Sequence, residues 1–300
     1  MTATNHWAMP FLHEAIVRVT PLSQGLQHHN DLLCLQDGSL WVAKLFAPTT
    51  WLGITQRDHL EFTEQFATVA ANRLALSLPA FCPNPPHFFI PVGQQLGLIK
   101  PYCPGEIHER LSYGRAEVLG TALATIHQLG FKHPRAKPFP AITGIDTSGL
   151  PWITPLIEQC NQHRHYRSHE WVIGHRDLHS HNIIWQDNNR PCFLDWESAG
   201  LIHPAIELLG LALNCAGVVE NQFDDALFSA TLHGYFKTVP YRFKTDDTLW
   251  QLIFHSWLLW YAYCLKQGKQ QDAAAMLTTL AHLRELVPTL KAIYSKTSES

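Results

Sequence analysis

One short segment near the middle of the chain holds the residues best suited to chemistry. It runs from Val172 to Ile184 and contains Asp177, with Asn182 five residues later. A second aspartate, Asp195, follows an apolar stretch shortly afterwards. One carboxylate that can meet a substrate hydroxyl, and two oxygen donors that can hold a cation, form a minimal set for moving a phosphoryl group from ATP. We therefore predict phosphoryl transfer, with Asp177 as the catalytic residue.

The sequence predicts a β-hairpin that brings the two candidate metal ligands together. Two strand-like runs flank a polar turn, in which Asn188 and Asn189 tolerate the positive φ angles of a tight hairpin loop. If these two residues form the loop, Asn182 pairs directly with Asp195 across the hairpin. Amide and carboxylate oxygens suit Mg²⁺, so we expect both side chains to bind this ion beside the nucleotide.

The order His-x-Asp-x-x-x-x-Asn and then Asp resembles the aminoglycoside phosphotransferase and choline kinase family. The resemblance continues along most of the chain. It includes a reduced nucleotide loop at residues 22–30, a lysine-bearing strand at 40–45, an interlobe hinge at 98–106 and a helix at 119–127. It implies a two-lobed, protein-kinase-like α+β fold, with a small antiparallel β-sheet in the first lobe and mainly α-helices in the second.

The same resemblance implies that the two lobes have different functions. Residues 1–102 would bind the nucleotide, and residues 103–300 would carry catalysis and the acceptor. An ammonium in an apolar strand is costly unless it is compensated, which favours phosphate binding by Lys44. A loop with a single glycine cannot form a full glycine-rich cradle. The residues expected to bind ATP are Ser23, Gly25, Lys44, Glu64, Lys100 and Tyr102.

The partner of Lys44 can be chosen from helical periodicity. Apolar spacing predicts a helix over residues 57–78, with Glu64 on its inward stripe and Glu61 on a polar face. A buried carboxylate requires a cation. We therefore predict that Glu64 pairs with Lys44 and that Glu61 faces solvent.

The second half of the chain is predicted to be mainly helical. Apolar spacing predicts a core helix over 115–129 and another over 206–213, while residues 130–155 are rich in Pro and Gly and suggest a surface loop. The second helix follows Glu197 so closely that no long activation segment fits between them. This argues against a protein kinase.

Charge and cysteine content narrow the partners and the compartment. A formal net charge of -3 gives no electrostatic reason to expect nucleic acid or an anionic membrane as a partner. The cysteines form no Cys-x-x-Cys pair and no charged-then-apolar leader opens the chain, so we expect reduced thiols and a cytoplasmic location. The most apolar run, at 257–265, is too short to span a bilayer and is expected to be a buried helix.

Two other functions compete with this interpretation. His175, Asp177, His179 and His181 alternate along the chain and could form the zinc site of a metallohydrolase, although that would leave Lys44 unexplained. The sparse nucleotide loop also allows a non-catalytic, pseudokinase-like nucleotide-binding protein.

Two residues beside Asp177 are expected to have structural roles. We expect His175 to anchor the loop by hydrogen bonding rather than to transfer protons. Arg176 stands where the small-molecule members often have Gly, and we expect it to pair with a neighbouring carboxylate.

The acceptor is a hydroxylated small molecule, and its identity is left open by the sequence. Trp257, Trp260 and Tyr261 have helical spacing, and together with Glu197 they could form a pocket for a cationic amino alcohol. The same spacing is also that of an ordinary core stripe. The resemblance allows amino alcohols, aminoglycosides and similar metabolites.

Overall fold

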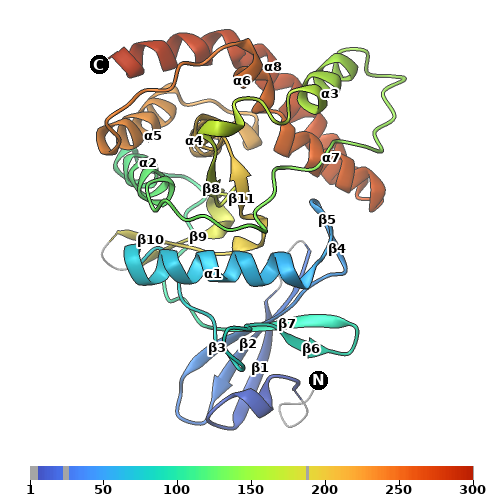
Figure 1. Ribbon diagram of the computed structural model, residues 1–300, viewed down its shortest axis with the longest axis vertical. Coiled ribbons are helices and arrows are strands. Elements are labelled where there is room, and N and C mark those ends of the chain that lie inside the picture. The colour runs from blue at the N-terminus through green and yellow to red at the C-terminus, as the bar shows by residue number, and fades with distance from the viewer. Residues whose placement is uncertain (1–5, 23–26, 187–188, 300) are drawn as a thin grey trace. The chain divides into compact units, whose positions relative to one another are not determined.

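The computed structural model describes residues 6–22, 27–186 and 189–299. The chain divides into two compact units, Met1–Gly105 and Glu106–Ser300. Figure 1 labels the helices and strands of both units.

Unit 1 is built around an antiparallel sheet of five strands in the order β1-β2-β3-β7-β6. A separate small hairpin is formed by β4 and β5. The strands are β1 (Ile16–Leu22), β2 (His29–Leu35), β3 (Leu40–Leu45), β4 (Thr49–Thr50), β5 (Gly53–Ile54), β6 (Ile90–Val92) and β7 (Gln95–Pro101).

Strand alternation sorts the side chains of unit 1 onto two faces of the sheet. Ala43 and its partner Ile99 pack in a cluster with Leu33 on one face. Because side chains alternate along a strand, Lys44 and its partner Leu98 lie on the opposite face. Leu98 packs there against Leu60 of helix α1 (Arg57–Leu74), which crosses that side of the sheet in Figure 1. The fold thus directs Lys44 toward the α1 side.

Helix α1 ends earlier than the predicted residue 78. Its last residue is Leu74, and Ala75 adopts a left-handed conformation with φ 55°. The left-handed residue turns the chain out of the helix, and the Leu76 N–H then donates back to the Ala70 carbonyl at 3.4 Å, which closes the helix end.

Unit 2 contains seven α-helices among the described residues. They are α2 (Tyr113–His127), α3 (Ile153–Gln162), α4 (Pro204–Cys215), α5 (Asp225–Thr238), α6 (Asp247–Leu252), α7 (His255–Lys266) and α8 (Gln270–Glu299). Helices α2 and α5 cross with their backbones close together. A Cβ atom at Gly120 would overlap the carbonyl of Thr231, and one at Gly234 would overlap that of Glu117. These two glycines permit the close packing.

Two short antiparallel strand pairs lie in unit 2. They are β8 (Val172–Gly174) with β11 (Gly200–Ile202), and β9 (Ile183–Gln186) with β10 (Arg190–Phe193). Together they hold the segment that carries the candidate chemistry.

The loop predicted at 130–155 is confirmed as far as Trp152, because the segment between α2 and α3 has neither helix nor strand. Ala136 and Ile142 are buried in it. Its Lys137 carbonyl accepts hydrogen bonds from Arg176 and from the backbone of Leu201. Buried carbonyls need donors, so this segment is fixed by the site that it covers.

The apolar run at 257–265 forms most of α7 and is buried, as predicted. Trp257, Leu258 and Tyr261 are all less than 10% exposed. Within the part of the chain that the structure describes, no helix has the length and apolar character needed to cross a bilayer.

Candidate active site

Asp177 and Asn182 are joined directly in unit 2. The Asn182 amide nitrogen donates to the Asp177 carbonyl at 2.9 Å and lies 3.4 Å from its carboxylate. Because this nitrogen is committed to Asp177, the amide oxygen is the donor that Asn182 can offer a cation. The Asp177 side chain is 31% exposed, so a substrate hydroxyl can reach its carboxylate.

The predicted hairpin register is wrong by one residue. Phe193 pairs with Ile183, and the Leu194 backbone N–H donates to the Asn182 carbonyl at 2.9 Å. Leu194 therefore takes the place expected for Asp195, and Asp195 is the next residue along the chain. The two candidate metal ligands remain neighbours in the fold, although they are not directly paired.

A longer loop explains the shifted register. The strands end at Gln186 and begin again at Arg190, so the connection has three residues instead of two. Asn189 has φ 57° and its N–H bonds to the Gln186 carbonyl, which is typical of a three-residue hairpin loop with a left-handed last residue. Asn188, the other predicted loop residue, lies outside the described residues.

Asp195 has a left-handed backbone, with φ 52° and ψ 57°. Aspartate tolerates this conformation better than most residues, and such strained positions concentrate at functional sites. The next side chain, Trp196, is buried and donates its indole N–H to the Phe193 carbonyl at 2.9 Å. This bond fixes the turn that follows Asp195.

His175 is an anchor, as predicted. It is fully buried, and its Nε2–H donates to the Leu194 carbonyl at 2.7 Å. Burial lowers its pKa, although the Asp177 carboxylate acts in the opposite direction. His175 thus ties the loop that carries Asp177 to the end of the hairpin while remaining neutral.

The expectation that Arg176 pairs through its guanidinium with a carboxylate is wrong. The guanidinium donates to the carbonyls of Ser198 and Lys137, at 2.6 and 3.0 Å, and lies 4.4 Å from the centre of the Phe139 ring. Burial lowers its pKa to about 9. Its backbone has φ 67°, which is the conformation that glycine adopts most easily.

A buried acid, Glu207, supports the loop that carries Asp177 and was missed from the sequence. The Arg176 backbone N–H, one residue before Asp177, donates to its carboxylate. His127 Nε2–H donates to the other carboxylate oxygen at 2.8 Å, and the Tyr235 hydroxyl donates to His127 Nδ1 at 2.7 Å. The sequence did contain a signal for this role. Glu207 is the single charged residue within the apolar stretch 204–213, and a buried carboxylate requires hydrogen-bond donors.

The histidines near Asp177 do not form a metal site. His175 is already bonded to a carbonyl, and burial together with the charge of His181 lowers the pKa of His179 to about 4. Among the described residues, no group of three or more His, Cys, Asp or Glu side chains could hold a metal ion. The structure gives no support to the metallohydrolase alternative.

In unit 1, Glu64 contacts a lysine other than the predicted one. Its carboxylate lies 2.8 Å from the Lys100 ammonium, and both Lys100 and Lys44 act on its charge. Burial nevertheless raises the pKa of Glu64. Lys44 and Lys100 lie on the same face, since Lys100 pairs with Val42 across the sheet. The Glu64 carboxylate therefore interacts electrostatically with both Lys100 and Lys44.

The expectation that Glu61 faces solvent is wrong. Glu61 is 4% exposed and accepts a hydrogen bond from the Phe88 backbone at 3.0 Å. It also lies 3.4 Å from Arg57 and 3.6 Å from His87. The segment before β6 covers this side of α1, so both glutamates of the helix are buried.

Three further residues are expected from the sequence to contact the nucleotide: Ser23, Gly25 and Tyr102. Ser23 and Gly25 fall outside the described residues. Tyr102 follows β7, and its backbone N–H donates to the Leu40 carbonyl at 3.0 Å. That N–H is used within the sheet, so any nucleotide contact of Tyr102 would come from its other groups.

The aromatic stripe on α7 is mainly core. Trp257 and Tyr261 are buried, and the ammonium of Lys269 lies 5.7 Å from the Trp260 ring centre. The stripe therefore does not offer the predicted open cage for a cationic amino alcohol.

Comparison with known proteins identifies the family. The model of the phosphotransferase enzyme family matches residues 41–245, more than half of the chain. No curated protein matches the chain.

Several solved structures share the fold. An amicoumacin kinase in complex with AMP-PNP, Ca²⁺ and Ami is 15% identical, with a TM-score of 0.68 over 93% of this chain and 89% of that one. A choline kinase from Cryptosporidium parvum is 12% identical, with a TM-score of 0.64 over 92% and 91%. A spectinomycin phosphotransferase bound to ADP and spectinomycin is 13% identical, with a TM-score of 0.62 over 96% and 95%.

These comparisons confirm the predicted family and the two-lobed α+β fold. At such low identities the structural neighbours establish only the fold, while the match to the family model establishes membership. The chain belongs to the phosphotransferase enzyme family and is a small-molecule phosphotransferase.

Proposed function

We propose that this protein transfers the γ-phosphate of ATP to a hydroxyl group of a small molecule. The main support is the link between Asp177 and Asn182. Asn182 donates to Asp177 through its side chain, and its backbone carbonyl accepts from the residue before Asp195. One acid and two candidate oxygen ligands are thereby gathered in a single loop and hairpin.

Asp177 would align the acceptor hydroxyl for attack and accept its proton. A positioned carboxylate acts in this way when it is reachable from solvent and held in one orientation. The Asp177 carboxylate is partly exposed, and the Asn182 amide nitrogen lies 3.4 Å from it while donating to the Asp177 backbone carbonyl. Glu207 would act as a positioning residue, because it holds the backbone just before Asp177.

Asn182 and Asp195 would hold a magnesium ion. One amide oxygen and one carboxylate suit this hard cation, which usually takes a few protein ligands and completes its shell with phosphate oxygens and water. When bound, the ion would neutralise charge on the phosphates. Both donors are oxygen atoms, and no His or Cys ligand is proposed, so the pair suits Mg²⁺ better than zinc.

In unit 1, Lys44 would bind the nucleotide phosphates, with Glu64 and Lys100 controlling its surroundings. Both lysines act on the buried Glu64 carboxylate, and they lie on the same face of the sheet. An ammonium binds phosphate oxygens through charge-assisted hydrogen bonds. Ser23, Gly25 and Tyr102 remain proposed nucleotide contacts.

The first experiment measures ADP release with a panel of acceptors that includes amino alcohols, aminoglycosides and hydroxylated acids. Asp177→Asn should lower transfer by roughly 10²–10⁴-fold, because it removes the acceptor's base. ATP binding, followed by calorimetry, should change little. Asp272→Asn, at an exposed position in the first turn of α8, is the matched control and should retain full turnover. Equal turnover in Asp177→Asn would exclude the assigned role, and ATP binding without turnover by the wild type would favour a non-catalytic binder.

A second experiment tests the metal ligands. Asp195→Ala should weaken ATP binding when Mg²⁺ is present and have little effect when it is absent, because the carboxylate acts through the ion. Nucleotide titration with and without Mg²⁺ measures both values. An unchanged magnesium dependence would rule out Asp195 as a ligand.

A further inference from the structure

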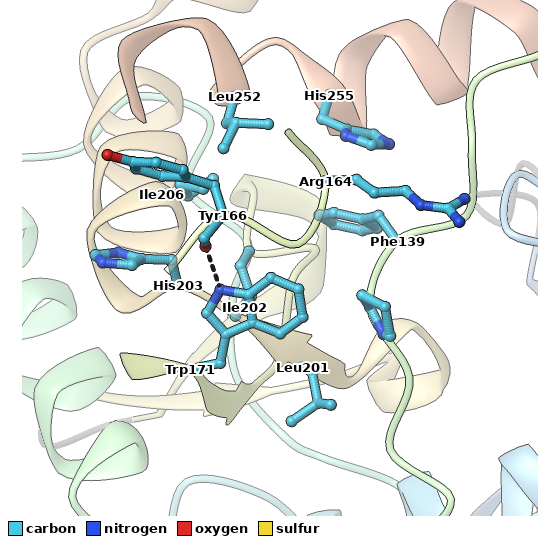
Figure 2. Close-up of a pocket in the computed structure, with 11 residues that line it drawn as sticks. Phe139, Arg164, Tyr166, Trp171, Leu201, Ile202, His203, Ile206, Leu252 and His255 are labelled. Atoms are coloured by element: carbon cyan, nitrogen blue, oxygen red, sulfur yellow. Dashed lines mark hydrogen bonds between the residues drawn. The ribbon is translucent and has the colours of Figure 1, made fainter. Parts of the chain in front are cut away.

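The strand that leads to Asp177 is packed tightly on its flank. Strand β8 pairs with β11, and Trp171, directly before β8, donates its indole N–H to the Tyr166 carbonyl at 3.1 Å (Figure 2). Leu201 and Ile202 of β11 line the same small hollow as this tryptophan. The hollow has room for little more than a water molecule, so it cannot hold an acceptor. The reacting hydroxyl of an acceptor would instead lie among the exposed side chains around Asp177.

After β8 the chain directs successive side chains to opposite sides. Leu178 is only 4% exposed, whereas the side chains of Asp177 and His179 are 31% and 37% exposed. The backbone of His179 is extended, with φ -140° and ψ 171°. Side chains two residues apart in an extended segment lie on the same side. Asp177 and His179 therefore face outward together.

Two hydrogen bonds fix the backbone of His179. The Asn214 side chain of α4 donates to the Leu178 carbonyl at 2.8 Å, and the Asn182 backbone N–H donates to the His179 carbonyl at 2.9 Å. The carbonyl on each side of the His179 Cα atom thus has a donor. The imidazole consequently projects from a fixed point.

The His179 imidazole faces the Asp177 carboxylate without bonding to it. His179 Nε2 lies 3.9 Å from Asp177 Oδ1, which is too long for a direct hydrogen bond. The other carboxylate oxygen, Oδ2, lies 3.4 Å from the Asn182 amide nitrogen. Nε2 carries the proton, because a lone pair directed at a carboxylate oxygen would be repelled. An N–H donor and a carboxylate acceptor therefore face each other across a gap.

The gap between Nε2 and Oδ1 suits one hydroxyl oxygen. An oxygen at a hydrogen-bond distance of about 2.8 Å from both atoms fits beside a pair that is 3.9 Å apart. A hydroxyl donates its proton to the carboxylate and accepts the N–H, whereas a protonated amine has no lone pair for the N–H. The charge of Asp195, a proposed magnesium ligand, also acts on His179. The gap thus lies between the proposed base and the proposed metal ligand.

We propose that His179 is a second catalytic residue, whose Nε2–H binds the oxygen of the acceptor hydroxyl while Asp177 takes its proton. The proposal rests on the proposed function and deepens it, because it assigns the group that recognises the reacting oxygen. In the transfer, this oxygen forms a bond to the γ-phosphorus with its remaining lone pair. The bond from the γ-phosphorus to the bridging oxygen breaks, and ADP leaves with that electron pair. The hydroxyl proton moves to Asp177 Oδ1, and the His179 proton stays on Nε2.

The test uses water as the acceptor, so that no particular substrate is needed. Phosphate release from ATP and Mg²⁺ is measured for the wild type, His179→Leu and His179→Gln. His179→Leu should lower kcat for hydrolysis roughly tenfold, the effect of one hydrogen bond, and leave the KM for ATP unchanged. His179→Gln should stay within about threefold of the wild type, because its amide supplies an N–H donor. His233→Leu, at a position in α5 whose side chain is 61% exposed, is the matched control and should retain full hydrolysis.

A binding measurement tests the same contact without turnover. ADP with Mg²⁺ and aluminium fluoride imitates the transferring phosphoryl group, with an attacking water opposite the leaving oxygen. Calorimetry should show that His179→Leu weakens this complex about tenfold, because transition-state analogues report contacts made during transfer. The affinity for ADP and Mg²⁺ alone should stay at the wild-type value.

Three results would overturn the proposal. The first is hydrolysis by His179→Leu at the wild-type rate, and the second is His179→Gln as slow as His179→Leu. The third is a folded His179→Leu protein that loses affinity for ADP alone, which would mean that the imidazole only supports the loop. Failure of the proposed function is distinguishable, because the wild type itself would then release neither phosphate from ATP nor ADP with the acceptor panel.

Discussion

In each unit a buried glutamate lies beside residues with a proposed function. These are Glu64 in unit 1 and Glu207 in unit 2, and their pKa values are shifted in opposite directions. Glu64 in unit 1 lies among lysines, and burial dominates and raises its pKa. For Glu207 in unit 2 burial acts in the same direction, but hydrogen bonds from His127 and the Arg176 backbone outweigh it and lower the pKa. Both carboxylates accept hydrogen bonds, Glu64 from Lys100 and from the Ala80 backbone, but only at Glu207 do the favourable interactions outweigh burial.

The difference matches what each glutamate has to do. Glu207 accepts a hydrogen bond from the backbone N–H of Arg176. Asp177 is the next residue, so this bond fixes the backbone that positions it. Glu64 contacts lysine side chains, whose ammonium groups have rotatable donors and no fixed fork geometry. A rigid network therefore suits the catalytic loop, and an adjustable one suits the lysines proposed to bind nucleotide.

The largest effect is expected for Glu207→Gln. The change removes the charge and leaves one of two buried donors poorly satisfied, so unfolding free energy should fall by about 2–3 kcal/mol. Urea denaturation measures this value, and turnover should fall as well. Glu158→Gln, at an exposed position in α3, should change stability by less than about 0.5 kcal/mol. Equal values for the two variants would remove the distinction between Glu207 and a surface acid.

The pH dependence of the same variant sharpens the comparison. Since the folded pKa of Glu207 lies below its ordinary value of 4.5, its contribution is fully present above pH 4.5 and is lost as pH falls through the folded pKa. The stability difference between wild type and Glu207→Gln should thus shrink in acid. Denaturation curves at several pH values between neutral and acid would measure it, and a difference that grows in acid would contradict the assignment.

Lys100→Met should have a smaller effect on stability. Breaking a buried ion pair costs ~3–5 kcal/mol, but Lys44 also acts on Glu64 and Lys100 is partly exposed, so we expect about 1–2 kcal/mol. The pKa of Glu64 should rise further, and a carboxyl with a raised folded pKa loses stability as pH rises through that pKa. The variant should therefore be more stable in mild acid than at neutral pH. Lys100→Arg should restore wild-type behaviour, and a pH-independent loss would argue against a charge effect.

The smallest effect is expected for Arg57→Ala at the edge of unit 1. Arg57 is 44% exposed and lies 3.4 Å from Glu61, which keeps its bond from the Phe88 backbone. Exposed ion pairs contribute little, so thermal and urea denaturation should show a loss of about 0.5 kcal/mol. A loss as large as that of Lys100→Met would mean that Glu61, not Glu64, is the important acid of α1.

Prediction was most successful where the signal was local. The spacing of Asp177 and Asn182, the apolar helices and the strand around Lys44 follow from residues close together in the chain, and the structure has those elements. Predictions were wrong where a segment distant in the sequence packs against the element in question. Glu61 was assigned to solvent from helix periodicity alone, but the segment at Phe88 covers it. Periodicity describes one helix face and does not reveal what packs on the other side.

The amino-acid sequence by itself determined the family, the α+β class and the identity of the candidate catalytic acid, because these depend on residue type and short spacing. Tertiary structure alone decided the hairpin register, the partner of Glu64 and the support of the catalytic loop by Glu207. The register depends on one additional loop residue, and the other two depend on contacts such as that between His127 and Glu207, which are 80 residues apart. Long-range contacts of this kind are fixed only when the chain packs, since local propensity has no influence on which distant side chains meet.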